Sequence, residues 1–252
     1  VRYIFNSVRF SFNLFCFLYG VVMRYLIDFS YSGMNFSGYQ KQKNLRTVQG
    51  EIESVLTSIN NNKNVVIYSS GRTDRGVNAL HQMAHFDMDY DINLDKLKKA
   101  LNSYLPDDIY INKVLKVPAD FHARYMALEK TYEYKINMGL YNPLTRGFIY
   151  QYGKKLDIAL MKDALKYLKG KHDFTTFVSA EDKRSDKVRC IYSASLTNKN
   201  DILTITFTGS GFLKYQVRNM VGLLIKIGEQ KERPENIPFL LNCKDRTKIG
   251  LT

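Results

Sequence analysis

The residues best suited to chemistry lie in a short glycine-containing segment, SGRTDRG, at residues 70–76. A single carboxylate, Asp74, stands between Arg72 and Arg75, shortly after an apolar run at residues 65–68. This pattern is typical of a strand that enters a tight loop. Two neighbouring cations stabilise an ionised carboxylate, so we expect a lowered pKa for Asp74 and a role as nucleophile or base. The alternative is an ordinary surface turn with a local salt bridge.

The overall charge favours a polyanionic partner. The chain of 252 residues carries 37 Lys and Arg against 24 Asp and Glu, a net charge of +13 that is spread along the sequence. Basic side chains bind phosphates and release counterions, so nucleic acid is the leading candidate. The 18 tyrosines and 15 phenylalanines include rings on which unpaired bases could stack, although most of them are needed for the core.

Cysteine and histidine spacing favours neither disulfides nor a metal site. The three cysteines are Cys16, Cys190 and Cys243. They are widely spaced and form neither a disulfide framework nor a zinc-binding pattern, which favours a reducing compartment. The four histidines have no cysteine or carboxylate cluster at ligand spacing, so no metal site is predicted. Phosphate-ester hydrolysis at Asp74 would require a metal or further acids nearby, and this class is therefore disfavoured.

The first 22 residues differ in composition from the rest of the chain. Residues 1–22 contain two arginines, no acid and a Phe-rich apolar run. The uncharged stretch at residues 11–23 is too short to span a bilayer, and there is no convincing small-residue cleavage site of a signal peptide. We therefore expect residues 1–22 to be an N-terminal extension, disordered or not native, and the folded protein to begin near Met23.

Hydrophobic periodicity predicts an N-terminal α+β domain over residues 23–122. Thr47 and Asn93 are expected to cap two amphipathic helices. Alternating or apolar runs predict four strands, at residues 24–31, 64–69, 80–88 and 109–117. The predicted order is strand, helix, strand, loop, strand, helix, strand, with Asp74 in the loop between the second and third strands.

The remaining residues, 123–252, repeat this order of elements. Strands are predicted at residues 131–138, 187–197 and 201–208, and helices after Asp157, at residues 216–227 and from Pro234. The predicted fold class is α+β, with two similar α/β-sandwich halves that each consist of a mainly antiparallel sheet backed by helices. A basic cleft between the halves would be the natural place for a nucleic acid.

Seven segments resemble, in their order along the chain, the signature segments of the tRNA pseudouridine synthase A family. The most specific is GRTD at residues 71–74, followed by Gly76 and Val77. The other segments are YSG at 31–33, RTVQG at 46–50, FHAR at 121–124, KTYEY at 130–134, HDF at 172–174 and VRNMVG at 217–222. The resemblance extends from about Met23 to Thr252, and its weight comes from the order of the motifs, since any one of them alone is short.

The resemblance implies a cofactor-free isomerase that converts uridine to pseudouridine in the tRNA anticodon stem-loop, at tRNA positions 38 to 40. By this resemblance Asp74 is the catalytic aspartate, Tyr132 stacks on or positions the target base, and Arg218 pairs with Asp74. From its place two residues before Asp74, Arg72 is expected to be a second partner of Asp74 or a phosphate contact. Extracting a base from its stack costs a few kcal/mol and requires an aromatic receiving surface, which Tyr132 would supply. A cytoplasmic homodimer is also implied.

Each assignment has a structural alternative. The basic side chains predicted to contact RNA are Lys41, Lys43, Arg75 and Arg124. The alternative is that these side chains are simply solvated, which is the usual case for surface cations. Tyr132 lies in an alternating strand, where an aromatic ring commonly serves sheet packing. Arg218 lies in a largely apolar helix, where an arginine on the core side needs a carboxylate partner.

The chain also departs from the family pattern. Asn78 stands where histidine is usual, Arg75 where a small residue is common and Tyr39 where tryptophan is common, changes expected to alter RNA contacts rather than chemistry. The sequence stops at Thr252, where a further strand normally follows, so we expect the C-terminal domain to lack its last strand.

The competing hypothesis is a non-catalytic RNA-binding protein or RNA chaperone of the same fold, inactive through an incomplete C-terminus. This hypothesis predicts salt-sensitive tRNA binding without isomerisation.

Overall fold

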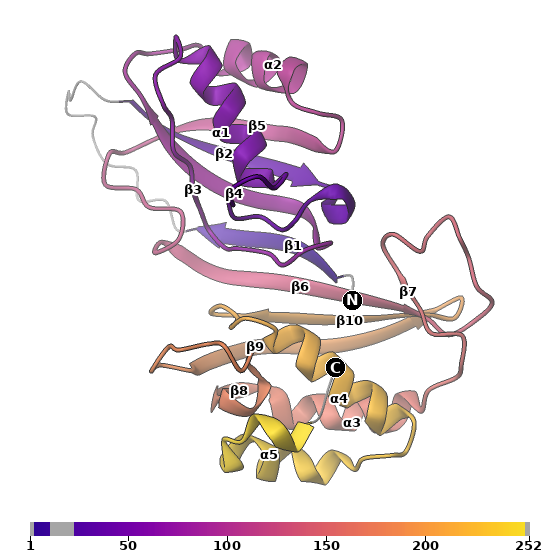
Figure 1. The fold of residues 1–252 in the computed structure, drawn as a ribbon. Helices are drawn as coiled ribbons and strands as arrows, with labels where there is room; N and C mark the ends of the chain where they lie inside the picture. Colours follow the sequence, from indigo (N-terminus) through magenta and orange to yellow (C-terminus); the bar gives the residue numbers. More distant parts are fainter. Residues whose placement is uncertain (1–2, 11–22, 250–252) are drawn as a thin grey trace. The chain divides into compact units, whose positions relative to one another are not determined.

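The computed structural model describes residues 3–10 and 23–249, which form two compact units (Figure 1). The N-terminal unit comprises residues 4–128, and the C-terminal unit is built mainly from residues 129–252. Each unit combines a mainly antiparallel sheet with helices, which confirms the predicted α+β class. The units divide between Leu128 and Glu129.

The sheet of the N-terminal unit has the strand order β5-β2-β4-β1, with β3 paired to β4. Its strands are β1 (Tyr3–Phe10), β2 (Met23–Tyr31), β3 (Tyr68–Ser69), β4 (Asn78–Met88) and β5 (Ile109–Val117). Strand β2 is antiparallel to both β4 and β5, while β1 runs parallel to β4. Strand β3 pairs with β4 at His85 and Ala84, so β1 and β3 share the edge of β4 opposite β2.

Strand β1 forms where the sequence analysis expected a disordered or non-native extension. Ile4 is paired with Asn78 and Phe5 with Ala79 at the start of β4. The edge of β4 offers unpaired backbone groups there, which an extended apolar segment can satisfy. The other residues of the predicted extension, 1–2 and 11–22, lie outside the described residues.

Helices α1 (Val48–Ile59) and α2 (Leu94–Tyr104) lie on the same side of this sheet (Figure 1). Both begin at the predicted caps. The Thr47 hydroxyl accepts a hydrogen bond from the Gly50 amide at 3.3 Å, and the Asn93 carboxamide accepts from the amides of Asp95 and Lys96, both at 3.1 Å. Because these caps satisfy amides that have no partner within the helix, the local sequence determines where each helix starts.

The strand predicted at residues 64–69 is shorter than expected, since only Tyr68–Ser69 joins the sheet. In the residues before Tyr68, backbone amides donate instead to side chains of α1. The Val65 amide donates to Thr57 Oγ1 at 3.1 Å, and the Ile67 amide donates to Glu53 Oε1 at 3.2 Å. Val65 and Ile67 are therefore buried against the helix without belonging to the strand ladder.

Glu53 anchors this connection, and its removal is expected to destabilise the unit. Its side chain is 4% exposed and accepts hydrogen bonds from the Ile67 amide, from Gln49 at 2.8 Å and from Lys41 at 3.0 Å. We expect Glu53→Ala to lower the free energy of unfolding by about 3 kcal/mol, because buried donors lose their acceptor. Urea denaturation measures the loss. Glu53→Gln keeps an acceptor and should lose less, so equal losses in the two variants would contradict this role.

His85 makes the stability of the N-terminal unit depend on pH. Burial lowers the pKa of His85 to about 4, from 6.5 for an ordinary histidine, and its Nδ1 accepts a hydrogen bond from the Ala123 amide at 3.2 Å. Between these two pKa values the unfolded chain binds a proton that the folded protein does not bind. The contribution of His85 is therefore complete above pH 6.5 and is lost as the pH falls toward 4, by up to about 3 kcal/mol.

Urea denaturation at a series of pH values measures this dependence. A His85→Asn variant can accept the same amide hydrogen bond but does not titrate. As the pH falls from 7 to 5, the unfolding free energy of the wild type should decrease relative to that of this variant. A difference between the two that does not change with pH would contradict the prediction.

The sheet of the C-terminal unit has the strand order β6-β10-β9-β8, with the short β7 parallel to β6. Its strands are β6 (Ala127–Asn137), β7 (Tyr150–Gln151), β8 (Gly170–Asp173), β9 (Val188–Lys199) and β10 (Ile202–Gly209). The pairs β6/β10, β10/β9 and β9/β8 are antiparallel. Asn200 and Asp201, with φ of 50° and 62°, make a two-residue turn of type I′ character between β9 and β10.

The helical segments of the C-terminal unit include the predicted helices after Asp157 and at residues 216–227. They are α3 (Ile158–Leu168), α4 (Gln216–Gly228), α5 (Ile237–Cys243) and the short 3-10 turns η2 (Thr175–Phe177), η3 (Pro234–Asn236) and η4 (Arg246–Ile249). The Asp157 carboxylate caps α3 by accepting from the Leu160 amide at 3.1 Å. Helices α3 and α4 lie on the same side of the sheet (Figure 1). Within the described ranges, none of the helices has the length and apolar character needed to cross a membrane.

Candidate active site

Asp74 lies in the loop of residues 70–77, which connects β3 to β4 in the N-terminal unit. The first part of this loop is fastened to β4. The Ser70 amide donates to the Met83 carbonyl at 2.8 Å, and the Ser70 hydroxyl donates to Gln82 Oε1 at 2.7 Å. Gln82 Nε2 in turn donates to the Gly71 carbonyl at 2.9 Å. Gln82 is fully buried, so these contacts are shielded from water and hold the loop firmly.

Asp74 begins a tight turn, as the sequence predicts. The Val77 amide donates to the Asp74 carbonyl at 3.2 Å, and Gly76 has a φ of +78°. A glycine with positive φ at the third position is characteristic of a type II turn. The Asp74 side chain is half-buried, while Arg72 and Arg75 on either side of it are exposed.

A second loop supports the Asp74 loop from the side of β2. The Tyr31 hydroxyl and Thr73 Oγ1 are 2.7 Å apart, and the Tyr39 amide donates to the Thr73 carbonyl at 3.1 Å. Gly38, with a φ of +105°, allows this approach, since a Cβ atom there would lie 3.3 Å from the Thr73 carbonyl oxygen. Thr73 is thus held through both its side chain and its backbone, which fixes the position of the neighbouring Asp74.

The turn η1 (Gly33–Asn35) approaches the end of the loop even more closely. The Gly33 amide donates to Asn78 Oδ1 at 2.8 Å, and a Cβ atom on Gly33 would lie only 2.0 Å from the Val77 carbonyl oxygen. Only glycine fits at this contact. Asn78 therefore has a structural function here, because it ties η1 to the start of β4.

The basic side chains that the sequence analysis proposed as substrate or RNA contacts in this unit are all exposed: Lys41, Lys43, Arg72, Arg75 and Arg124. Two of them also have partners within the unit. Lys41 forms an ion pair with Glu53 at 3.0 Å, and the Arg124 guanidinium carbon lies 6.0 Å from the centre of the Tyr125 ring. The N-terminal unit therefore combines Asp74 with five exposed cations.

Tyr132 and Arg218 belong to the C-terminal unit. Tyr132, on β6, is 7% exposed and meets the Phe212 ring edge-on at a centroid distance of 5.1 Å. Arg218, on α4, has its guanidinium carbon 5.5 Å from the centre of the Tyr215 ring. Burial raises the pKa of Tyr134, and the positive charge of Arg218 opposes this rise, so Arg218 also lies near β6. Arg218 therefore lies near Tyr215 and Tyr134, while Tyr132 packs on Phe212.

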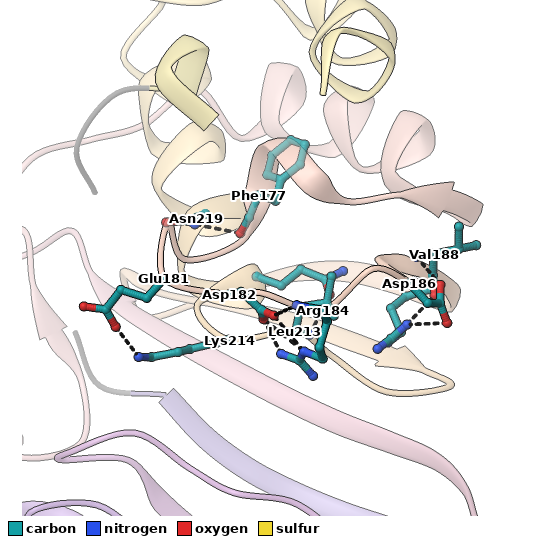
Figure 2. A network of polar contacts seen from close by, with 11 residues as sticks. Phe177, Glu181, Asp182, Arg184, Asp186, Val188, Leu213, Lys214 and Asn219 are labelled. Atoms are coloured by element: carbon teal, nitrogen blue, oxygen red, sulfur yellow. Dashed lines mark hydrogen bonds and ion pairs between the residues drawn. The ribbon is translucent and has the colours of Figure 1, made fainter. Parts of the chain in front are cut away.

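Buried hydrogen bonds fix the segment that leads into α4 (Figure 2). Asn219 Nδ2 donates to the Phe177 carbonyl at 2.6 Å, and the Ser179 amide donates to the Lys214 carbonyl at 3.0 Å. Lys214 also forms an ion pair with Glu181 at 2.8 Å. These contacts attach the start of α4, and with it Arg218, to the loop that follows η2.

That loop contains its own buried carboxylate. Hydrogen bonds from Arg184 hold the pKa of Asp182 down at about 2, and the Asp182 amide donates to the Ser179 carbonyl at 3.0 Å (Figure 2). The stabilisation from this ion pair is complete above the ordinary pKa of 3.8 and is lost as the pH falls through 2. Asp182 therefore acts as a structural anchor at neutral pH.

Several residues that position the site were missed by the sequence analysis. Gln82, Tyr31 and Thr73 hold the Asp74 loop, and Phe212 packs on Tyr132. Gln82 carried no local signal, because β4 also contains the polar residues Asn78, His81, His85 and Asp87. Tyr31 and Thr73 lie within the YSG and GRTD segments that carry the family resemblance, although no positioning role was predicted for them, whereas Phe212 has no local signal.

Comparisons with known proteins identify the family of this chain. A family model described as tRNA pseudouridine synthase matches residues 29–126, which include the Asp74 loop, and residues 164–252, which include Arg218. The tRNA pseudouridine synthase A of Streptococcus pyogenes serotype M3 (strain MGAS315) is 43% identical over 234 residues, covering 92% of this chain and 94% of that protein. Proteins of the same name from serotypes M49 and M1 show the same identity and coverage. The predicted resemblance is thereby confirmed, and the chain belongs to the tRNA pseudouridine synthase family.

Proposed function

We propose that this protein isomerises uridine to pseudouridine in tRNA. The observation that carries the proposal is the fixed presentation of one carboxylate, Asp74, on a loop held from two sides, in a chain similar to proteins named tRNA pseudouridine synthase A. In the reaction the C1′–N1 bond breaks, the uracil turns, and a C1′–C5 bond forms. C5 loses a proton and N1 gains one, so the reaction needs no oxidant, reductant or group donor.

Asp74 is the proposed catalytic residue. An ionised carboxylate can attack the sugar or the base as a nucleophile, or accept the proton released from C5. Arg72, which lies on the same loop, supplies positive charge for the substrate.

Arg218 and Tyr132 are the substrate-binding residues that we propose from the C-terminal unit. Arg218 Nε is buried and has no hydrogen-bond partner among the residues that the structure describes. A buried Nε–H donor requires an acceptor, which supports a pairing of Arg218 with Asp74 or with the substrate. Tyr132 receives the extruded uracil.

We also propose which part of the tRNA is modified. Phosphate contacts by the exposed cations Lys41, Lys43, Arg75 and Arg124 would orient the anticodon stem-loop of tRNA, with the target uridine at tRNA positions 38 to 40. A homodimer in the cytoplasm is proposed on the resemblance to the family.

Mapping pseudouridine at single-nucleotide resolution tests the function. Unmodified tRNA transcripts are incubated with the full chain, and pseudouridine is expected within the anticodon stem-loop. Salt-sensitive tRNA binding without pseudouridine would overturn the proposal in favour of the non-catalytic RNA-binding alternative. Pseudouridine found only elsewhere in the tRNA would overturn the proposed positions.

A further inference from the structure

A cluster of five aromatic rings, which we call the aromatic cluster, lies in the N-terminal unit outside the Asp74 loop. Its members are Tyr68, His85, Phe121, His122 and Tyr125. Tyr68 is stacked on His85 with ring centroids 5.1 Å apart and an angle of 22° between the rings. His122 lies 4.6 Å from His85 and 4.3 Å from Tyr125. The rings therefore form a continuous series rather than separate contacts.

The aromatic cluster leads from the core to the solvent. Phe121 and His85 are buried, whereas Tyr68 is 50% exposed and Tyr125 is 77% exposed. A ring that served only to fill the core would be covered. The outer tyrosine instead combines a large free surface with a rigid aromatic support, which is the form of a stacking platform for planar ligands.

Backbone hydrogen bonds hold the support in place. The Arg124 amide donates to His122 Nδ1 at 3.1 Å, and the Tyr125 amide donates to the His122 carbonyl at 3.2 Å. Arg24 donates to the Phe121 carbonyl at 2.9 Å. Because the segment is already ordered, a ligand that stacks on Tyr125 does not have to supply the ordering free energy.

The charge beside the aromatic cluster favours nucleic acid over an apolar partner. Arg124 is exposed next to Tyr125, and the chain as a whole has a net charge of +13. Burial lowers the pKa of both His85 and His122, so their rings are neutral at neutral pH and can act as stacking partners. An aromatic face flanked by a cation matches an unpaired base and its phosphate.

We propose that Tyr125, supported by His122 and flanked by Arg124, stacks on an unpaired nucleobase of the RNA substrate. This binding site is additional to the proposed uridine site at Asp74, and it rests on the proposed function only in that RNA is the substrate. Arg124 contacts the adjacent phosphate, and Tyr68, whose ring centroid lies 5.9 Å from that of His122, extends the aromatic surface.

Binding of an unmodified tRNA transcript, measured as a function of salt concentration, tests the proposal. Tyr125→Ala is expected to raise the Kd about 5- to 100-fold, the loss typical of one stacked base. The slope of the logarithm of the association constant against the logarithm of the salt concentration should stay unchanged, because no phosphate contact is removed. Tyr125→Phe keeps the ring and should bind as the wild type does, whereas Tyr125→Leu keeps apolar bulk without the ring and should bind as weakly as Tyr125→Ala.

Arg124→Gln separates the stacking contact from the phosphate contact. Removing this cation is expected to weaken binding and to reduce the magnitude of the salt slope by about one. An unchanged slope in this variant would remove Arg124 from the proposed site.

Tyr104→Ala is the matched control, since Tyr104 is 72% exposed at the end of α2 in the same unit. It should leave the Kd unchanged. The proposal is overturned if Tyr125→Ala binds like Tyr104→Ala, or if Tyr125→Leu binds like the wild type. It is also overturned if Tyr125→Ala changes the oligomeric state in sedimentation, because Tyr125 would then contact a protein partner.

The wild-type mapping experiment keeps this inference separate from the proposed function. Wild-type protein that modifies tRNA while Tyr125→Ala binds normally refutes the aromatic site alone. Wild-type protein that binds tRNA without forming pseudouridine refutes the proposed function, and a weakened Tyr125→Ala would still establish the stacking site.

Discussion

Replacement of Asp74 by alanine is expected to abolish pseudouridine formation while tRNA binding is retained. Asp74 is the only carboxylate in the loop of residues 70–77, so no neighbouring acid in the loop can take over its role. Loss of the nucleophile or base should lower the single-turnover rate by at least about 10³-fold. Binding should persist, because removing a negative charge does not weaken the attraction between the exposed cations and phosphate.

Single-turnover formation of pseudouridine and a parallel tRNA-binding titration measure the two effects. Asp107→Ala is the matched control, since Asp107 is an exposed aspartate in the same unit and its loss changes the net charge equally. Asp74→Asn keeps the size of the side chain and should be as inactive as Asp74→Ala. A fully active Asp74→Ala variant would refute the assignment of Asp74 as the catalytic residue.

Gly33→Ala is expected to displace the Asp74 loop and to destabilise the N-terminal unit. The added methyl group would lie 2.0 Å from the Val77 carbonyl oxygen, which is a backbone atom and cannot turn away as a side chain can. The two segments must therefore separate, and the hydrogen bond from the Gly33 amide to Asn78 is strained with them. We expect a loss of about 3 kcal/mol in the free energy of unfolding, together with reduced activity of the folded protein.

Gly76→Ala provides the control within the same loop. A Cβ atom on Gly76 would have no other atom within 4 Å, so no close contact opposes the added methyl group. The positive φ alone should lower the free energy of unfolding of this variant by about 1 kcal/mol. Urea denaturation of both variants, followed by activity under conditions where each is folded, compares the two effects. If Gly33→Ala is no less stable than Gly76→Ala, the close contact with Val77 does not constrain the loop.

Much of the secondary structure could be predicted because its causes are local. Thr47, Asn93 and Asp157 cap the helices at the predicted places, since a cap needs only the amides two or three residues further on. The turn at Asp74 was predicted for the same reason, because a glycine tolerates the positive φ that Gly76 adopts.

The errors arise where distant residues compete for backbone groups. The predicted strand at residues 64–69 is reduced to β3 because Thr57 and Glu53 accept from the amides of Val65 and Ile67. Strand β1 forms at residues 3–10 because β4 has a free edge there. Periodicity within a segment contains no information about either partner.

The sequence by itself determined the family, the two-part α+β architecture and the loop that presents Asp74 between two arginines, since these depend on local preferences and on the order of motifs. Only the tertiary structure decided what holds that loop: Tyr31 on Thr73, Gly33 against Val77 and the buried Gln82. It also decided that rings from β3, β4 and the loop before β6 assemble beside Tyr125. Such contacts join residues far apart in the chain, and strand register and close packing determine them, neither of which a local pattern specifies.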